Sequence, residues 1–339
     1  MSGPRPSRPR TLRAVRVGVA LQEYDLESGR PAGLADLADQ AQRAEELGFD
    51  SVWVMDHFWI EGGGRRRGAV EPLVALAHLA ARTRRVRLGV LVLCNPFRHP
   101  GQLAREAAAL AEAAEGRLIL GLGAGWHRPE FEAFGLPFDH LVSRLEETLE
   151  VLPPLLRGER VSFEGRYLRL QEAEIVTTAP APPVWVAASG PRMLRLAARR
   201  AAGWNAAWGG PDARWYRGLL TALRRAEAAE GRVEPLTTSA GLLALPVEGA
   251  ALDRVLAGVT RLTGESEASL RDRVAVGGPE RLAGAIRGYA EAGAEHVLLS
   301  LSVAPFSGLD PTYLDRAAGA VALLREAERF RSPGNPSPR

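Results

Sequence analysis

The chain has 339 residues, a mass of 36.5 kDa and a formal net charge of +3 at pH 7. Its 46% hydrophobic and 24% charged residues are ordinary for a globular protein, which excludes a largely disordered chain. The sequence has no run of 18 apolar residues that could cross a membrane, and its single cysteine, Cys94, cannot form an internal disulfide. All 43 basic residues are arginine, so any mechanism that needs a lysine amine is excluded as well.

The two ends of the chain differ from the rest. Residues 1–14 are rich in proline and arginine and lack the apolar core of a signal peptide, so we predict a disordered tail on a cytoplasmic protein. Residues 331–339 predict a second disordered tail. No linker interrupts residues 15–330, which we expect to form one domain.

Between the tails, apolar runs typical of strands alternate with helical patterns. The first four predicted strands are 15–21, 51–55, 86–93 and 118–122. The helices after them are 34–47, 70–81, 102–114 and 141–152, the last of which we expect to end at Pro153 and Pro154. A hairpin is predicted at 161–170.

The second half repeats the alternation. Its predicted strands are 184–187, 204–208, 237–245 and 296–301, with helices after 190, over 213–230, after 279 and after 310, and a helical insertion within 251–273. Eight strand–helix units with near-continuous apolar strands predict a single (β/α)8 TIM barrel, an α/β fold with two insertions. A doubly wound open sheet is the alternative, because counting units does not prove closure.

The active site of such a barrel lies where the strands end, so polar residues just after each strand are candidates. These are Gln22, Glu23, Asp56, His57, Cys94, Asn95, the run 121–126, Ser189, Gly190, Gly209, Gly210, Ser300 and Ser302. Among them His57 stands out, because an imidazole can donate a proton or stabilise negative charge near neutral pH. A histidine on a surface loop is the alternative interpretation.

Two glycine-containing segments suggest ligand contacts. The run 121–126 (GLGAGW) resembles a dinucleotide fingerprint, but Trp126 replaces the third glycine, so we exclude a Rossmann site and expect a flat ring close to the backbone, or simply a tight turn. Ser189-Gly190-Pro191-Arg192 opens a helix directly after a strand, which favours an anion, or else only caps the helix.

Other polar residues have less specific interpretations. His127 and Glu130 are three residues apart and could bind a metal only with further ligands; we therefore predict no metal site. Residues 62–67 (GGGRRR) predict a flexible, solvated loop, or a lid over the site. The small net charge gives no reason to expect a nucleic-acid partner.

Several segments together resemble the bacterial-luciferase-like monooxygenase superfamily. They are 44–58 (AEELGFDSVWVMDHF), 86–89 (VRLG) with His99-Pro100, 116–126 (GRLILGLGAGW) with Glu130, 163–167 (FEGRY), 182–186 (PPVWV) and 276–280 (VGGPE). These segments occur in family order over nearly the whole predicted domain. The overall similarity favours the branch that uses the deazaflavin coenzyme F420.

The resemblance implies a role for particular residues. Asp56 would contact the cofactor, and His57 would be the proton donor or charge stabiliser beside its reactive ring. The other cofactor-binding positions implied are Leu91, Val92, Cys94, Ala124, Gly125, Ser189, Gly190, Arg192 and Met193, the last four near the phosphate tail. The F420-dependent branch also carries a cis peptide bond at the position of Leu91-Val92.

The chain departs from the branch that oxidises sugar phosphates, which has a carboxylate at the position of Trp126 and lysines around the substrate phosphate. The absence of lysine predicts a small, largely apolar substrate beside Trp126, with Trp59 and Trp208 as further pocket residues. We therefore expect hydride transfer with F420. The alternatives are an FMN-dependent monooxygenase supplied by a partner reductase and a flavin-binding barrel without catalysis. The resemblance also implies a homodimer, a small-molecule substrate and no membrane partner.

Overall fold

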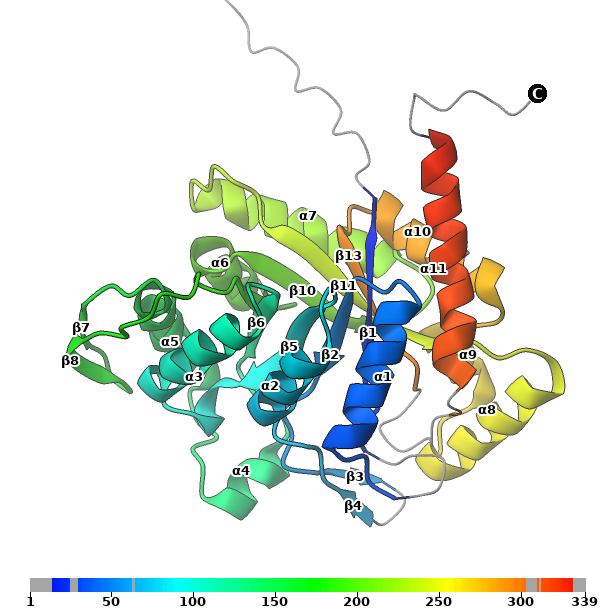
Figure 1. Cartoon of the computed structure of the whole chain (residues 1–339), viewed down its shortest axis with the longest axis horizontal. Coiled ribbons are helices and arrows are strands. Elements are labelled where there is room, and N and C mark those ends of the chain that lie inside the picture. Colours follow the sequence, from blue (N-terminus) through cyan, green and yellow to red (C-terminus); the bar gives the residue numbers. More distant parts are fainter. Residues whose placement is uncertain (1–13, 25–29, 63–64, 303–309, 311, 332–339) are drawn as a thin grey trace, which may run out of the picture.

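The computed structural model describes the whole chain except residues 1–13, 25–29, 63–64, 303–309, 311 and 332–339, so the two predicted tails lie largely outside the described residues. Eight parallel strands form a closed barrel (Figure 1). In order around the barrel they are β1 (Arg16–Ala20), β2 (Ser51–Val54), β5 (Arg87–Cys94), β6 (Leu118–Gly123), β9 (Val184–Ala187), β10 (Gly203–Gly209), β11 (Thr237–Leu245) and β13 (His296–Ser300). Because β1 pairs with both β2 and β13, and β10 pairs with β11, the predicted barrel is confirmed and the open sheet is wrong.

An outer layer of helices covers the barrel. These helices are α1 (Leu34–Glu46), α2 (Pro72–Arg82), α3 (Pro100–Ala113), α5 (Leu141–Leu156), α6 (Pro191–Arg200), α7 (Arg214–Ala229), α10 (Pro279–Glu291) and α11 (Thr312–Arg331). Most of them contact the next helix around the ring. Helix α1 shows why they lie on the sheet, since its buried residues Leu37, Ala38, Ala41 and Ala44 recur at helical spacing.

The two predicted insertions are present. A hairpin of β7 (Val161–Glu164) and β8 (Arg169–Ala173) follows α5. The helices α8 (Gly249–Thr263) and α9 (Glu267–Arg273), with the short strand β12 (Ala275–Val276), lie between β11 and β13.

Three local predictions are wrong. Instead of the solvated loop predicted at 62–67, strand β3 (Ile60–Gly62) pairs antiparallel with β4 (Arg65–Arg67), and Arg67 is buried. The short helices η1 (Asn95–Phe97) and α4 (Arg128–Phe134) were not predicted. Helix α5 continues through Pro153 and Pro154 to Leu156, because its last turn buries Leu155 and Leu156 and this packing offsets the missing N–H groups.

Large side chains fill the barrel interior. The rings of Trp53 and Trp185 lie 5.5 Å apart and are almost completely buried. Only glycine fits beside them, since a Cβ atom at Gly89 or Gly203 would lie 2.4 Å from the facing indole. His296 packs edge-on against both indoles. This packing fills the interior below the mouth of the barrel.

Burial lowers the pKa of His296 well below its usual value, and the nearby arginines Arg16 and Arg87 lower it further. The imidazole is therefore neutral, and its Nε2 lies 2.8 Å from the Ser51 hydroxyl. His296 is therefore a fully buried packing residue of the barrel interior. Among the described helices, none is long and apolar enough to cross a membrane.

Candidate active site

A cavity of about 630 Å³ lies at the carboxyl ends of the barrel strands. Its wall includes residues at the ends of six barrel strands (Ala20, Cys94, Ala187, Ala207, Leu243 and Ser300) and residues that follow the other two, β2 and β6 (Met55 and Gly125). In Figure 1 the β3–β4 hairpin and α4 lie at this lower end of the barrel. The cavity therefore occupies the place where the barrel fold predicts an active site.

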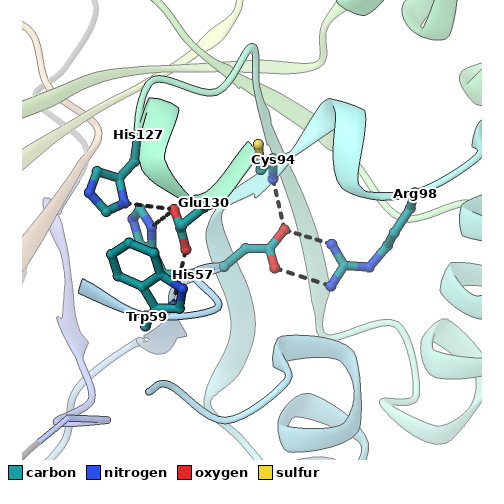
Figure 2. Close-up of polar contacts among 7 residues, drawn as sticks. His57, Trp59, Cys94, Arg98, His127 and Glu130 are labelled. Atoms are coloured by element: carbon teal, nitrogen blue, oxygen red, sulfur yellow. Dashed lines mark hydrogen bonds and ion pairs between the residues drawn. The ribbon is translucent and has the colours of Figure 1, made fainter. Parts of the chain in front are cut away.

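Two histidines share one carboxylate at the cavity wall (Figure 2). His57 follows β2, whereas His127 and Glu130 come from the segment after β6 that begins α4. The Nδ1 atoms of His57 and His127 lie 2.9 and 3.0 Å from Oε2 of Glu130. The other oxygen, Oε1, accepts the backbone N–H of Trp59 at 3.1 Å. Glu130 thus joins the loop after β2 to the loop after β6.

The ionisation of Glu130 sets the tautomer of both histidines. Burial raises the pKa of this carboxyl, but hydrogen bonds from His57, the Trp59 N–H and His127 outweigh burial, so its pKa lies below the usual value. An ionised carboxylate only accepts hydrogen bonds. Each Nδ1 must therefore carry a proton, which leaves Nε2 of His57 as the ring nitrogen able to exchange a proton with a bound molecule.

The same three residues meet the condition that the sequence left open for a metal. The donor atoms of His57, His127 and Glu130 all lie within 4.8 Å of one another. They are already joined by two hydrogen bonds to the shared carboxylate. The prediction of no metal stays a prediction.

Asp56 has partners of its own, which differ from those of Glu130. Its Oδ2 accepts the Cys94 backbone N–H at 2.8 Å and one Arg98 nitrogen at 2.6 Å, and its Oδ1 accepts the other Arg98 nitrogen at 3.1 Å. Burial raises the pKa of Asp56, and the ion pair with Arg98 opposes that shift. Arg98 also donates to Glu71 at 2.5 Å. Figure 2 shows Arg98 approaching from the side opposite to His127.

Most predicted site residues line the cavity. They are Asp56, His57, Leu91, Val92, Cys94, Gly125, Trp126 and Trp208. The peptide bond between Leu91 and Val92 is cis, as the resemblance implied. Burial raises the pKa of Cys94, which keeps its thiol protonated at neutral pH. Trp126 is 68% exposed, and its ring meets the His57 imidazole edge-on at 5.7 Å.

Trp59 and Ala124 do not line the cavity. Trp59 lies behind it, where its ring packs edge-on against His127 and beneath the Arg66 guanidinium, 4.1 Å from the ring centre. Its backbone N–H is the group that holds Glu130. The Trp59 N–H is therefore placed to position the carboxylate, and Ala124 packs against the barrel core. Contact of either residue with a ligand stays a prediction.

The predicted phosphate-tail residues lie outside the cavity, at the start of α6. Ser189, Gly190 and Arg192 are exposed, and Met193 is half-buried. No side chain caps this helix, and nothing lies within 4 Å of a Cβ atom built on Gly190. Arg192 is held by Ser143 at 2.8 Å and Glu146 at 2.9 Å. The N-terminal start of α6, next to the mouth of the barrel, is thus open to an anion.

Sequence reasoning missed Glu130 as a central residue, as well as Arg98 and Tyr24. Glu130 gave one signal, its spacing from His127, but its link to His57 spans 73 residues. Arg98 gave no signal, because arginines are common throughout this chain. Tyr24 follows β1 but stands one residue beyond the polar candidates Gln22 and Glu23.

The chain belongs to the luciferase-like monooxygenase family, whose family model matches residues 16–257. It is 32% identical over 320 residues to an F420-dependent glucose-6-phosphate dehydrogenase of Kineococcus radiotolerans, covering 85% of this chain and 93% of that protein. It is 39% identical over 219 residues to a protein of the same name from Nakamurella multipartita, covering 62% of this chain and 63% of that relative. The predicted family membership is confirmed, and these relatives support its F420-dependent branch.

A solved structure gives the same fold. It is an F420-dependent secondary alcohol dehydrogenase in complex with an F420-acetone adduct, with a TM-score of 0.73 and 18% identity, over 91% of this chain and 99% of that one. At this identity the likeness shows the TIM-barrel fold alone.

Proposed function

We propose that this protein is an F420-dependent oxidoreductase that transfers a hydride between the deazaflavin and a small, largely apolar organic substrate. The observation that carries the proposal is the His57–Glu130 pair at the mouth of a barrel whose sequence relatives are F420-dependent. The pair supplies a proton-exchanging nitrogen beside an apolar cavity, which hydride transfer to or from an oxygen-bearing carbon requires.

The residues present fit the cofactor. The cavity wall around Leu91, Val92 and Gly125 is apolar and suits a flat ring. A side chain at Gly125 would lie 2.8 Å from the Cys94 sulfur and 2.7 Å from the Phe131 ring, so only glycine leaves this wall intact. The uncapped start of α6 offers free N–H groups to a phosphate at Ser189 and Gly190.

The bound deazaflavin supplies the carbon that gives or takes the hydride. His57 would hold or release the accompanying proton at Nε2, because Glu130 keeps the other nitrogen protonated. Trp126 and Trp208 would exclude water from the substrate side. Asp56 and Arg98 would fix the start of the segment after β5, through the Cys94 N–H.

A substrate other than a sugar phosphate is part of the proposal. The cavity wall contains Leu91, Val92, Phe97, Trp126, Trp208 and Leu243. This composition favours an apolar molecule, although the relatives' names include glucose-6-phosphate dehydrogenase. As further proposals, the protein acts in the cytoplasm, forms the homodimer that the resemblance implies, and has an F420 reductase as a partner.

The first test is a titration of the purified protein with F420 and, separately, with FMN at the same salt concentration. Tight binding of F420 alone supports the proposal. Tight binding of FMN alone overturns it in favour of a monooxygenase, and binding of neither overturns both.

A matched pair of variants tests where the phosphate of F420 binds. Gly190→Asp places a carboxylate at the start of α6, where there is room for it, and Gly190→Asn places a neutral group of the same shape there. Both side chains are good helix caps, so neither variant should lose stability. We expect Gly190→Asp to weaken F420 binding at least tenfold more than Gly190→Asn does. Equal affinities of the two variants would mean that the phosphate binds elsewhere.

A further inference from the structure

Tyr24 carries a buried hydroxyl without a partner at the cavity wall. The residue follows β1, is 4% exposed and lines the cavity. Its hydroxyl oxygen has no hydrogen-bond partner, and of the described residues with such an atom Tyr24 is the one that lines the cavity. An unpaired buried hydroxyl costs free energy. A bound molecule that brings an acceptor to this wall removes that cost.

The surroundings keep this hydroxyl protonated. Burial raises the pKa of Tyr24 well above its usual value, and the charges of Glu23, Glu130 and Asp56 raise it further. The group is therefore a hydrogen-bond donor at neutral pH. The same three carboxyl groups also make this part of the wall unfavourable for a negatively charged group of a bound molecule.

The charged groups of the cavity wall also disfavour an anionic substrate. Three carboxyl groups and two histidines line it (Asp56, Glu61, Glu130, His57 and His127), whereas no arginine lines it among the described residues. Both histidines are held by Glu130, and Glu61 pairs with Arg66. The internal segments outside the description, 25–29, 63–64, 303–309 and residue 311, contain no basic residue in their sequence. Nearby Arg98 is already paired with Asp56 and Glu71. A phosphate or carboxylate on the substrate would find acidic groups and no free cation on this wall.

We infer that Tyr24 donates a hydrogen bond to the carbonyl or hydroxyl oxygen of an uncharged substrate, and that the cavity rejects anionic substrates. This inference rests on the proposed function and narrows it to ketones, aldehydes and alcohols without a charged group. Tyr24 acts in it as a binding residue that determines specificity, whereas His57 remains the residue that exchanges the proton.

The experiment measures binding rather than turnover. F420-loaded wild type, Tyr24→Phe and Tyr216→Phe are titrated with cyclohexanone and acetophenone, and with cyclohexanecarboxylate and benzoate as anionic probes, by ligand-observed NMR. Tyr216 is the matched control, because it is fully buried and does not line the cavity. We expect the ketones to bind wild type at least tenfold more tightly than the anions. We expect Tyr24→Phe to weaken ketone binding about five- to tenfold, the effect of losing one hydrogen bond, and Tyr216→Phe to change it less than twofold.

Two further measurements distinguish failure of the Tyr24 inference from failure of the proposed F420 dependence. Thermal unfolding of cofactor-free Tyr24→Phe should occur at or above the wild-type temperature, because the variant loses an unpaired hydroxyl and no hydrogen bond. F420 affinity should be the same in both tyrosine variants and in wild type. Ketone affinity unchanged by Tyr24→Phe, no ketone binding to wild type, or tighter binding of the anions would each overturn the inference and leave F420 dependence standing. Absence of F420 binding to wild type would instead refute the proposed function.

Discussion

Replacing Glu130 with glutamine tests the geometry of the site most directly. The carboxylate accepts two imidazole N–H groups on Oε2 and the Trp59 N–H on Oε1, and its side chain is 1% exposed. An amide of the same shape has only one accepting oxygen. If that oxygen faces the histidines, the amide NH2 meets the Trp59 N–H. If it faces Trp59, the NH2 meets both Nδ1 atoms and forces the histidines into the other tautomer.

Either arrangement costs stability. In the first arrangement the buried Trp59 N–H loses its partner, at about 1–3 kcal/mol, and in both arrangements the hydrogen bonds lose the assistance of a negative charge. We expect Glu130→Gln to lower the free energy of unfolding by about 2–4 kcal/mol, measured by urea unfolding at pH 8. Glu132→Gln is the control, because Glu132 is 64% exposed and its ion pair with Arg128, at 3.6 Å, is on the surface, so its loss should stay below about 0.5 kcal/mol.

The tautomers give a second measurement. Nitrogen NMR of the histidine rings at pH 8 should find the proton of His57 and His127 on Nδ1 in wild type. In Glu130→Gln either at least one ring should carry it on Nε2, or the Trp59 amide should exchange faster with solvent. F420-dependent turnover should fall about 10²–10⁴-fold where His57 holds the wrong tautomer. A variant with wild-type stability and unchanged tautomers would refute the assignment of Glu130 as the group that orients His57.

Two other variants test the electrostatics. Arg98→Met leaves the Asp56 carboxylate buried without its cation, so the free energy of unfolding, measured by urea unfolding, should fall by about 3–5 kcal/mol at pH 7. The loss should be smaller at lower pH, where Asp56 is protonated. A loss under about 1 kcal/mol at pH 7 would contradict the stabilising role of the ion pair. The pKa of His296 is depressed in the folded protein. Its contribution to the free energy of unfolding is therefore complete above its unfolded pKa of about 6.5. That contribution is lost as the pH falls below this value, at up to about 1.4 kcal/mol per pH unit. The stability of His296→Gln, measured by urea unfolding at several pH values, should lack that part of the slope, and equal slopes in variant and wild type would contradict the buried neutral imidazole.

The architecture could be predicted from the sequence because each strand and helix has its own periodic pattern. The eight barrel strands lie within a few residues of their predicted positions, since buried parallel strands are continuous apolar runs. The errors fall where tertiary contacts override local preference. Helix α5 passes two prolines because Leu155 and Leu156 are buried, and the hairpin at 60–67 forms although its glycines and arginines favour a loop.

The site was predictable only in part. His57, Asp56 and Trp126 could be named because they follow strands, and strand ends meet at one end of a barrel. The partners of those residues could not be named, because Glu130 lies 73 residues from His57 and Arg98 lies 42 residues from Asp56. Whether a polar side chain is satisfied, as at Tyr24, is decided by atomic positions that no pattern in the sequence records.

The shared carboxylate has a consequence for how this barrel can change. The loops after the strands of a TIM barrel ordinarily vary one at a time, which lets the fold host many reactions. Here the loop after β2 supplies His57 and the Trp59 N–H, and the segment after β6 supplies the only acceptor that the described residues offer to both. Exchanging either loop alone would leave buried groups unpaired in the other. The two loops therefore form a single module, to be inherited, grafted or redesigned together.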